Sequence, residues 1–197
     1  MSCSKLTTTR RYGRAILGGV FVVVITGPPG AGKTSVLTAL VDSLTDDDIA
    51  HAAIELETLA WTHPALGDEL WSRHIQATCG LYREAGHSIL LVAETIETDD
   101  DLDQLLDALD ADGRYLVRLE APPATLAQRI IDREPASWSG LDELVEHAQE
   151  LAASMPGLAA VDLVVSTEGQ RPEAVAARIR AGLPDAFVMP GSARSLS

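Results

Sequence analysis

Two patterns of apolar residues alternate along this chain. Short apolar runs have the length of buried strands, and between them apolar residues recur every three or four positions, as in amphipathic helices. Strands are predicted over 20–25, 50–57, 88–93, 114–120 and 161–165, and helices over about 35–44, 65–85, 99–109, 123–133, 141–155 and 172–181. Alternating strands and helices predict an α/β fold with a parallel sheet between two helical layers. A ligand is then expected at the carboxyl ends of the strands.

The pattern fits one domain over 20–184 with little regular structure outside it. Residues 1–19 are polar and weakly basic, and 185–197 are rich in Pro, Gly and Ser, so both are predicted to be flexible. The apolar residues 16–25 follow three arginines and superficially resemble a signal peptide. Because they run directly into a glycine-rich loop, we expect neither a signal peptide nor a membrane span.

Composition narrows the class of protein. Hydrophobic residues make up 46% of the 197 residues, which is typical of a globular protein. The net charge of −14 argues against nonspecific binding to nucleic acid or to anionic membranes. The only cysteines are Cys3 and Cys79, which form no disulfide framework and no metal-binding spacing. A cytoplasmic location is expected, and the oligomeric state is not indicated.

A glycine-rich loop carries the clearest chemical signal. After the first strand come Gly27, Pro28, Pro29, Gly30, Ala31, Gly32, Lys33 and Thr34, which match G-x-x-x-x-G-K-[ST]. In this motif, backbone N–H groups and the helix N-terminus bind the phosphates of a nucleotide. Lys33 is expected to reach the β- and γ-phosphates, and the Thr34 hydroxyl to ligate Mg²⁺. We assign Ser35 to the same site, with ATP and Mg²⁺ as cofactors.

Sequence and spacing resemble the small P-loop kinases, which include nucleoside monophosphate, gluconate and shikimate kinases and chloramphenicol phosphotransferase. The resemblance covers about 20–183. It rests on the loop, an acid after the second strand, a helix with two arginines, and the last strand–loop–helix unit. It implies a three-layer P-loop NTP hydrolase fold with a five-stranded sheet in the order 2-3-1-4-5. It also implies a short lid at about 134–140.

The resemblance further implies which acids act. Glu57 occupies the place of the acid that faces the acceptor hydroxyl, and it is our candidate base. Glu55 remains the alternative, because alternation along a strand puts both carboxylates on one face, opposite Ile54 and Leu56. Glu94 follows the apolar run 89–93 and is expected to hold Mg²⁺ through water, together with Thr34.

Arginines and a polar loop complete the implied site. By resemblance, Arg129 stacks on the adenine and Arg133 reaches phosphate, while Ile130 and Ile131 face the core. Gln170 and Arg171 are placed near the base. We predict both arginines to be catalytic as well, adding positive charge at the transferring phosphoryl group when the lid closes.

The function expected is transfer of the γ-phosphate of ATP to a hydroxyl of a small-molecule acceptor, such as an antibiotic, a sugar-like metabolite or a nucleoside. A nucleoside monophosphate kinase is the alternative within this class, and an ATP-binding switch or assembly ATPase is the alternative outside it. The lid 134–140 contains no Lys or Arg, which favours a neutral or cationic acceptor. Arg73, Arg118 and Arg133 are the residues that would instead suit a phosphorylated acceptor. In the lid, Trp138 either closes over a ligand or packs between helices.

Overall fold

The computed structural model describes residues 19–59 and 61–183, and a five-stranded parallel sheet lies at its centre. The strands are β1 (Phe21–Thr26), β2 (Ala52–Glu55), β3 (Ile89–Ala93), β4 (Gly113–Glu120) and β5 (Leu163–Ser166). Their order across the sheet is β2-β3-β1-β4-β5. The predicted fold class and strand order are therefore confirmed.

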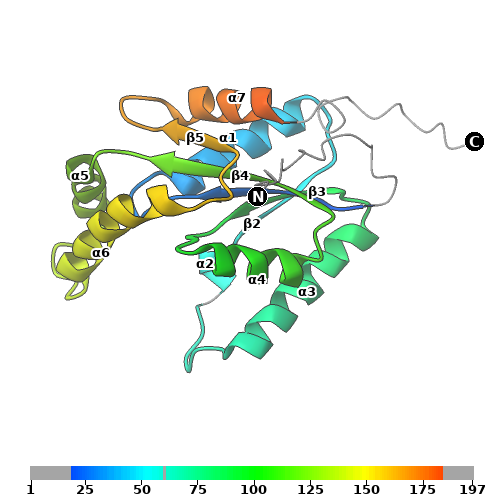
Figure 1. Cartoon of the computed structure of the whole chain (residues 1–197), viewed down its shortest axis with the longest axis horizontal. Coiled ribbons are helices and arrows are strands. Elements are labelled where there is room, and N and C mark those ends of the chain that lie inside the picture. The colour runs from blue at the N-terminus through cyan, green and yellow to red at the C-terminus, as the bar shows by residue number, and fades with distance from the viewer. Residues whose placement is uncertain (1–18, 60, 184–197) are drawn as a thin grey trace, which may run out of the picture.

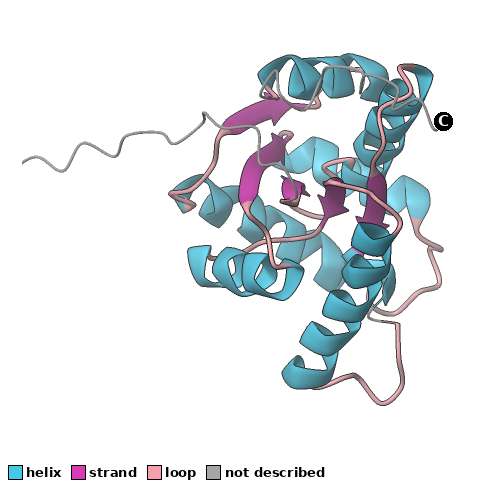
Figure 2. Ribbon diagram, turned by 90° about the vertical axis from the view of Figure 1, so that its right-hand side faces the viewer, coloured by secondary structure: helices cyan, strands magenta, loops and turns pink. Residues whose placement is uncertain are grey.

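Helices cover both faces of the sheet. The helices α1 (Lys33–Asp46) and α7 (Pro172–Gly182) lie together on one face, and α3 (Asp68–Glu84) and α4 (Asp99–Leu109) lie on the other (Figure 1). Beyond the carboxyl ends of β4 and β5, α5 (Pro123–Arg133) packs against α6 (Leu141–Ser154), which continues into a 3₁₀ turn, η1 (Met155–Gly157). Figure 2 shows the strands enclosed between these helices.

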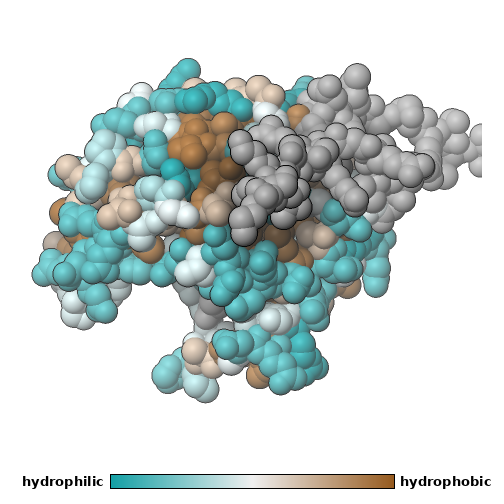
Figure 3. Space-filling view, viewed as in Figure 1, coloured by the Kyte–Doolittle hydropathy of each residue, from teal (hydrophilic) through white to brown (hydrophobic). Residues whose placement is uncertain are grey.

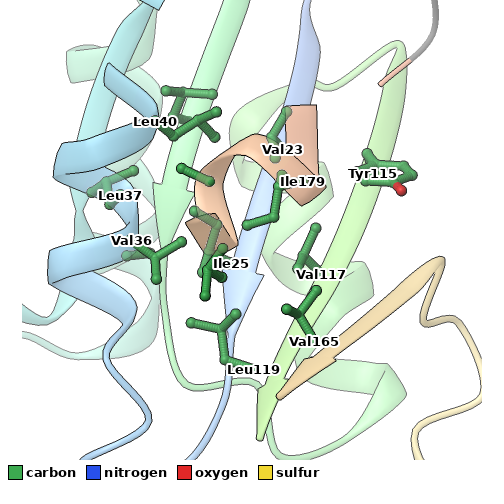
Figure 4. Packing of buried hydrophobic residues seen from close by; sticks show 14 of the residues in the cluster. Val23, Ile25, Val36, Leu37, Leu40, Tyr115, Val117, Leu119, Val165 and Ile179 are labelled. Carbon is green, nitrogen blue, oxygen red and sulfur yellow. The ribbon is translucent and has the colours of Figure 1, made fainter. Parts of the chain in front are cut away.

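Aliphatic side chains fill both layers of the core. On one side, Val23 and Ile25 of β1 pack with Leu40 of α1 and Ile179 of α7 (Figure 4). On the other side, alternate residues of the same strand, including Val22 and Val24, pack toward α3 and α4. Burial on both faces explains why β1 is a continuous apolar run without alternation.

The elements differ from the sequence predictions mainly at their ends. The second strand is shorter than 50–57 because the chain turns into a short helix, α2 (Leu56–Leu59), directly after Glu55. The predicted helix over 65–85 begins at Asp68, and its apolar residue Leu70 is exposed. Ile130 is buried as predicted, but Ile131 is half exposed, so its assignment to the core was wrong.

The chain ends lie largely outside the described residues. Of the predicted extension 1–19 only Gly19 is described, and the predicted tail 185–197 is not described at all. Among the helices within 19–59 and 61–183, none is both long and apolar enough to cross a membrane.

Candidate active site

The glycine-rich loop lies between β1 and α1 and contacts two other elements. Gly30 has a φ of 80° and Gly32 a φ of 92°, a region that favours glycine. A Cβ on Gly30 would lie 2.8 Å from the carbonyl oxygen of Leu126 in α5. The loop thus combines a left-handed backbone with close backbone contact, which explains glycine at this position. Gly32 directly precedes the first residue of α1, so the loop leads into the N-terminus of that helix.

Lys33 lies at the centre of a polar network. Its side chain is almost fully buried, and its Nζ donates hydrogen bonds to the Gly27 carbonyl oxygen at 3.0 Å and to Thr95 Oγ1 at 2.8 Å. The same Nζ lies 3.2 Å from Oε1 of Glu57. Thr95 in turn donates its hydroxyl hydrogen to Glu57 Oε1 at 2.8 Å. Residues from three separate segments therefore meet beside the phosphate-binding loop.

Glu57 is held in its ionised form. Burial by itself acts to raise the pKa of Glu57, but the charge of Lys33 and the hydrogen bond from Thr95 act against it. The hydrogen bond from Lys33 and the charge of Arg133 act in the same direction, and together these effects bring the pKa below its ordinary value. A carboxylate that stays ionised at neutral pH can accept a proton.

A second group of oxygen atoms surrounds Thr34. The Thr34 hydroxyl hydrogen-bonds to Glu55 Oε1. Glu94 directly follows β3, and its Oε1 accepts a hydrogen bond from the backbone N–H of Thr95 at 2.9 Å. Burial, and then the negative charges of Glu57 and Glu55, raise the pKa of Glu94 to about 7. Extra positive charge at this point would therefore stabilise the ionised form of Glu94.

These oxygen donors suit Mg²⁺ better than a transition metal. Magnesium prefers hard oxygen ligands and is usually held by one or two carboxylates, waters and substrate phosphates. Within residues 19–59 and 61–183, no three or more His, Cys, Asp or Glu side chains form a group that could hold a metal by themselves. Thr34, Glu55 and Glu94 thus fit a magnesium ion that is completed by nucleotide phosphates.

Two findings here were not anticipated from the sequence. Glu57 lies in α2 and not on the strand, so the predicted shared strand face of Glu55 and Glu57 was wrong. Leu56 is nevertheless buried and Glu57 exposed, as alternation required. Thr95 was missed, because one threonine after an apolar strand matches no motif. The available signal was its place two residues after the apolar run 89–93.

Arg129 connects the phosphate loop to the loop after β5. Its guanidinium donates to the Gly30 carbonyl oxygen at 3.1 Å, and to the hydroxyl and carbonyl oxygens of Thr167, both at 2.9 Å. Gln170 lies in this second loop, where its side chain donates to the Ser166 carbonyl oxygen at 2.8 Å. Arg171 follows it at the N-cap of α7. Arg129 is thus joined to the loop after β5, which also contains Gln170 and leads into Arg171.

The other arginines are in different surroundings. Arg133 ends α5, is largely exposed, and pairs with Glu134 at 2.7 Å. Arg118 is buried in β4, donates to the Met155 carbonyl oxygen at 2.8 Å and lies 3.6 Å from a carboxylate oxygen of Glu120. Arg73 borders an open depression on α3, on the side away from the buried Ile75 and Cys79.

Comparison with known proteins identifies the family. The model of the AAA_33 family, described as an AAA domain, matches residues 22–155, which include the loop, Glu55, Glu57, Glu94 and the arginine helix. The chain belongs to this family. No curated protein matches the chain.

Solved structures of small P-loop kinases share the fold of this AAA_33 protein. A sugar kinase from Janibacter sp. HTCC2649 is 20% identical with a TM-score of 0.59, over 85% of this chain and 98% of the kinase. A gluconokinase from Sinorhizobium meliloti 1021 is 19% identical with a TM-score of 0.57, over 87% and 94%. An APS kinase from Mycobacterium tuberculosis, solved with AMPPNP and APS, is 13% identical with a TM-score of 0.56, over 83% and 97%. The predicted resemblance to small P-loop kinases is confirmed at the level of fold.

Proposed function

We propose that this AAA_33 protein is an ATP- and Mg²⁺-dependent phosphotransferase that moves the γ-phosphate of ATP to a hydroxyl of a small-molecule acceptor. The observation that carries the proposal is the direct contact of the loop lysine Lys33 with an ionised carboxylate, Glu57, while the Thr95 hydroxyl hydrogen-bonds to both. Phosphoryl transfer requires positive charge at the phosphoryl group and a base near the attacking hydroxyl. Lys33 and Glu57 supply these two groups side by side.

ATP binding is assigned to the loop and its surroundings. The backbone of Gly27–Lys33 and the N-terminus of α1 would hold the phosphates, and the loop after β5, with Gln170 and Arg171, would border the base. Thr34, Glu55 and Glu94 would hold Mg²⁺, which neutralises charge on the β- and γ-phosphates. The fold of the kinases described above supports this arrangement.

Glu57 is proposed to orient the acceptor and take its proton. As the acceptor oxygen forms its bond to the γ-phosphorus, its proton moves to a carboxylate oxygen of Glu57, and ADP leaves with the electrons of the broken P–O bond. In the structure Lys33 and Glu57 contact each other directly. Binding of the γ-phosphate would draw Lys33 toward phosphate and free Glu57 for the acceptor.

The arginines are proposed to have different tasks. The Arg129 guanidinium is already used by the Gly30 carbonyl and Thr167, so it positions the phosphate loop. Arg133 is exposed at the end of α5, where it pairs with Glu134. Arg133 is therefore the better candidate to add positive charge at the transferring phosphoryl group.

The deciding experiment is the dependence of ATP turnover on an added acceptor. Formation of ADP should be slow with Mg²⁺ and ATP alone, and should increase with a hydroxylated acceptor that becomes phosphorylated. The panel should include sugars, nucleosides, nucleoside monophosphates and antibiotics, with the Lys33→Ala variant as the inactive control. Turnover that is equally fast without any acceptor would favour an ATPase switch and contradict the proposal.

A further inference from the structure

Two tryptophans near the site are unusually exposed. Trp61 follows α2, which bears Glu57, and 83% of it is exposed. Trp138 lies in the connection 134–140 between α5 and α6, and 45% of it is exposed. Trp71, in contrast, packs against the core. Large exposed aromatic side chains lose the free energy that burial would provide, so their position beside a reactive site points to a ligand that covers them.

The two segments lie on opposite sides of a hollow. The α2–α3 connection is at the lower end of the molecule, and the α5–α6 connection is at its far left (Figure 1). The space-filling view shows a notch between these two parts (Figure 3). The charge of Arg133, directly before the second connection, acts on Glu57. The end of α5 therefore lies within electrostatic range of α2, which bears Glu57.

The ring of Trp138 has a fixed place in its connection. The backbone is held by hydrogen bonds from Trp138 N to the Pro135 carbonyl at 2.9 Å and from Leu141 N to the Trp138 carbonyl at 3.3 Å. The ring lies against Gly140, where a Cβ would come within 2.6 Å of it. The φ of Gly140 is −89°, which any residue adopts. Glycine is thus needed here only to leave room for the tryptophan ring.

We propose that Trp61 and Trp138 form the two walls of the acceptor site, and that the acceptor is an uncharged hydroxyl compound with an aromatic ring. This inference rests on the proposed function for the location of the hydroxyl beside Glu57. A flat apolar ring gains stacking contact with both indoles, whereas a plain polyol does not. The connection 134–140 contains no Lys or Arg, and Glu55 and Glu57 are acidic, which disfavours an anionic acceptor. Arg133, directly before this connection, pairs with Glu134 and is assigned to the transferring phosphoryl group.

The test compares acceptors that differ only by a ring. Phenyl β-D-glucoside is matched with methyl β-D-glucoside, and 1-phenyl-1,2-ethanediol with 1,2-propanediol. Binding to the full chain is measured by tryptophan fluorescence with Mg²⁺ and a non-hydrolysable ATP analogue, and transfer by release of ADP with ATP. We expect the phenyl compounds to bind roughly 4- to 100-fold more tightly, the combined effect of two ring contacts.

Variants test whether the preference for phenyl compounds comes from Trp61 and Trp138. Trp61→Ala and Trp138→Ala should each reduce it by roughly 2- to 10-fold, while Trp→Phe at either position should retain most of it. Gly140→Ala, which displaces the Trp138 ring, should act like Trp138→Ala. Leu81→Ala removes a side chain that is similarly exposed on α3 and is the matched control, with no change expected. Nucleotide affinity should be the same in all variants.

The outcomes separate this inference from the proposed function. Equal or absent binding of phenyl and methyl compounds, or a preference that survives in the double Trp→Ala variant, overturns the aromatic acceptor. A parallel loss of ATP affinity also overturns it, since the indoles would then belong to the nucleotide site. Phosphorylation of compounds without any ring preference leaves the phosphotransferase standing. If phenyl compounds bind in a way that depends on the two tryptophans but no hydroxyl is phosphorylated, the aromatic acceptor site is supported and the phosphotransferase function is contradicted.

Discussion

Replacing Glu57 by glutamine is expected to change two measurements in opposite directions. Glu57→Gln keeps the size of the side chain and removes the charge that lies 3.2 Å from Lys33 Nζ. Transfer to the acceptor should fall by about 10²–10⁴-fold, the usual contribution of a general base. Nucleotide binding should not fall, because Lys33 no longer has to leave an ionic partner before it contacts phosphate.

The size of the effect on nucleotide binding follows from the exposure of the pair. Two unit charges at 3.2 Å attract each other by about 1.3 kcal/mol in bulk water. About half of the Glu57 side chain is exposed, so the range for surface pairs applies, about 0.2–1 kcal/mol. The glutamine variant should therefore bind ATP roughly 1.5- to 5-fold more tightly.

The assay combines titration calorimetry with Mg²⁺ and a non-hydrolysable ATP analogue, and initial rates at saturating ATP. Glu55→Gln serves as the comparison, because Glu55 contacts Thr34 and not Lys33. Its main effect should be a higher Mg²⁺ requirement. Normal transfer by Glu57→Gln together with an inactive Glu55→Gln would show that Glu55 is the base. If Glu57→Gln bound nucleotide tenfold or more weakly, the idea that Glu57 and phosphate compete for Lys33 would be refuted.

Four further outcomes are expected. Lys33→Ala should lower transfer by at least about 10³-fold in the initial-rate assay; activity near wild type would exclude the kinase. Gly30→Ala should abolish nucleotide binding in calorimetry and lower the melting temperature, because its Cβ would lie 2.8 Å from the Leu126 carbonyl. Thr95→Val should lower kcat with little change in the KM for ATP, and Thr95→Ser should restore it; equal loss in both variants would contradict a role of the hydroxyl. Because the pKa of Glu94 rises from its ordinary 4.5 to about 7 on folding, its contribution to stability is present below pH 4.5 and lost by about pH 7. The melting temperature of wild type should therefore fall more between pH 4.5 and pH 7 than that of Glu94→Gln, which lacks this ionisation.

Sequence patterns predicted the elements of this fold better than the contacts of its site. Strand β1 is buried on both faces, so it is recognisable in the sequence as an apolar run. The loop motif requires a strand before it and a helix after it, and both are present. The helix α2 has four residues, which are too few to show a helical pattern of apolar positions, so Glu57 was expected on a strand. Ile131 was expected in the core together with Ile130, but a helix directs adjacent side chains to different sides, and only Ile130 of the two is buried.

The meeting of Lys33, Thr95 and Glu57 depends on the strand order. Thr95 follows β3 and Glu57 follows β2, and parallel pairing of β1, β3 and β2 brings all three strand ends to the same edge. The chain pattern predicted that edge as the ligand site. It could not predict which side chains would touch, because that depends on register and on side-chain direction.

The packing of α5 against the phosphate loop has a consequence for the entropy of ligand binding. Leu126 contacts Gly30, Arg129 hydrogen-bonds to the same residue, and Ile130 is buried, so the first part of α5 is joined to the nucleotide half of the site. Within the described residues, no hydrogen bond joins the connection 134–140 to the phosphate loop, so this connection is free to move over a ligand. The nucleotide half is therefore ordered before ATP arrives, and the loss of chain freedom on closing is concentrated in the acceptor step.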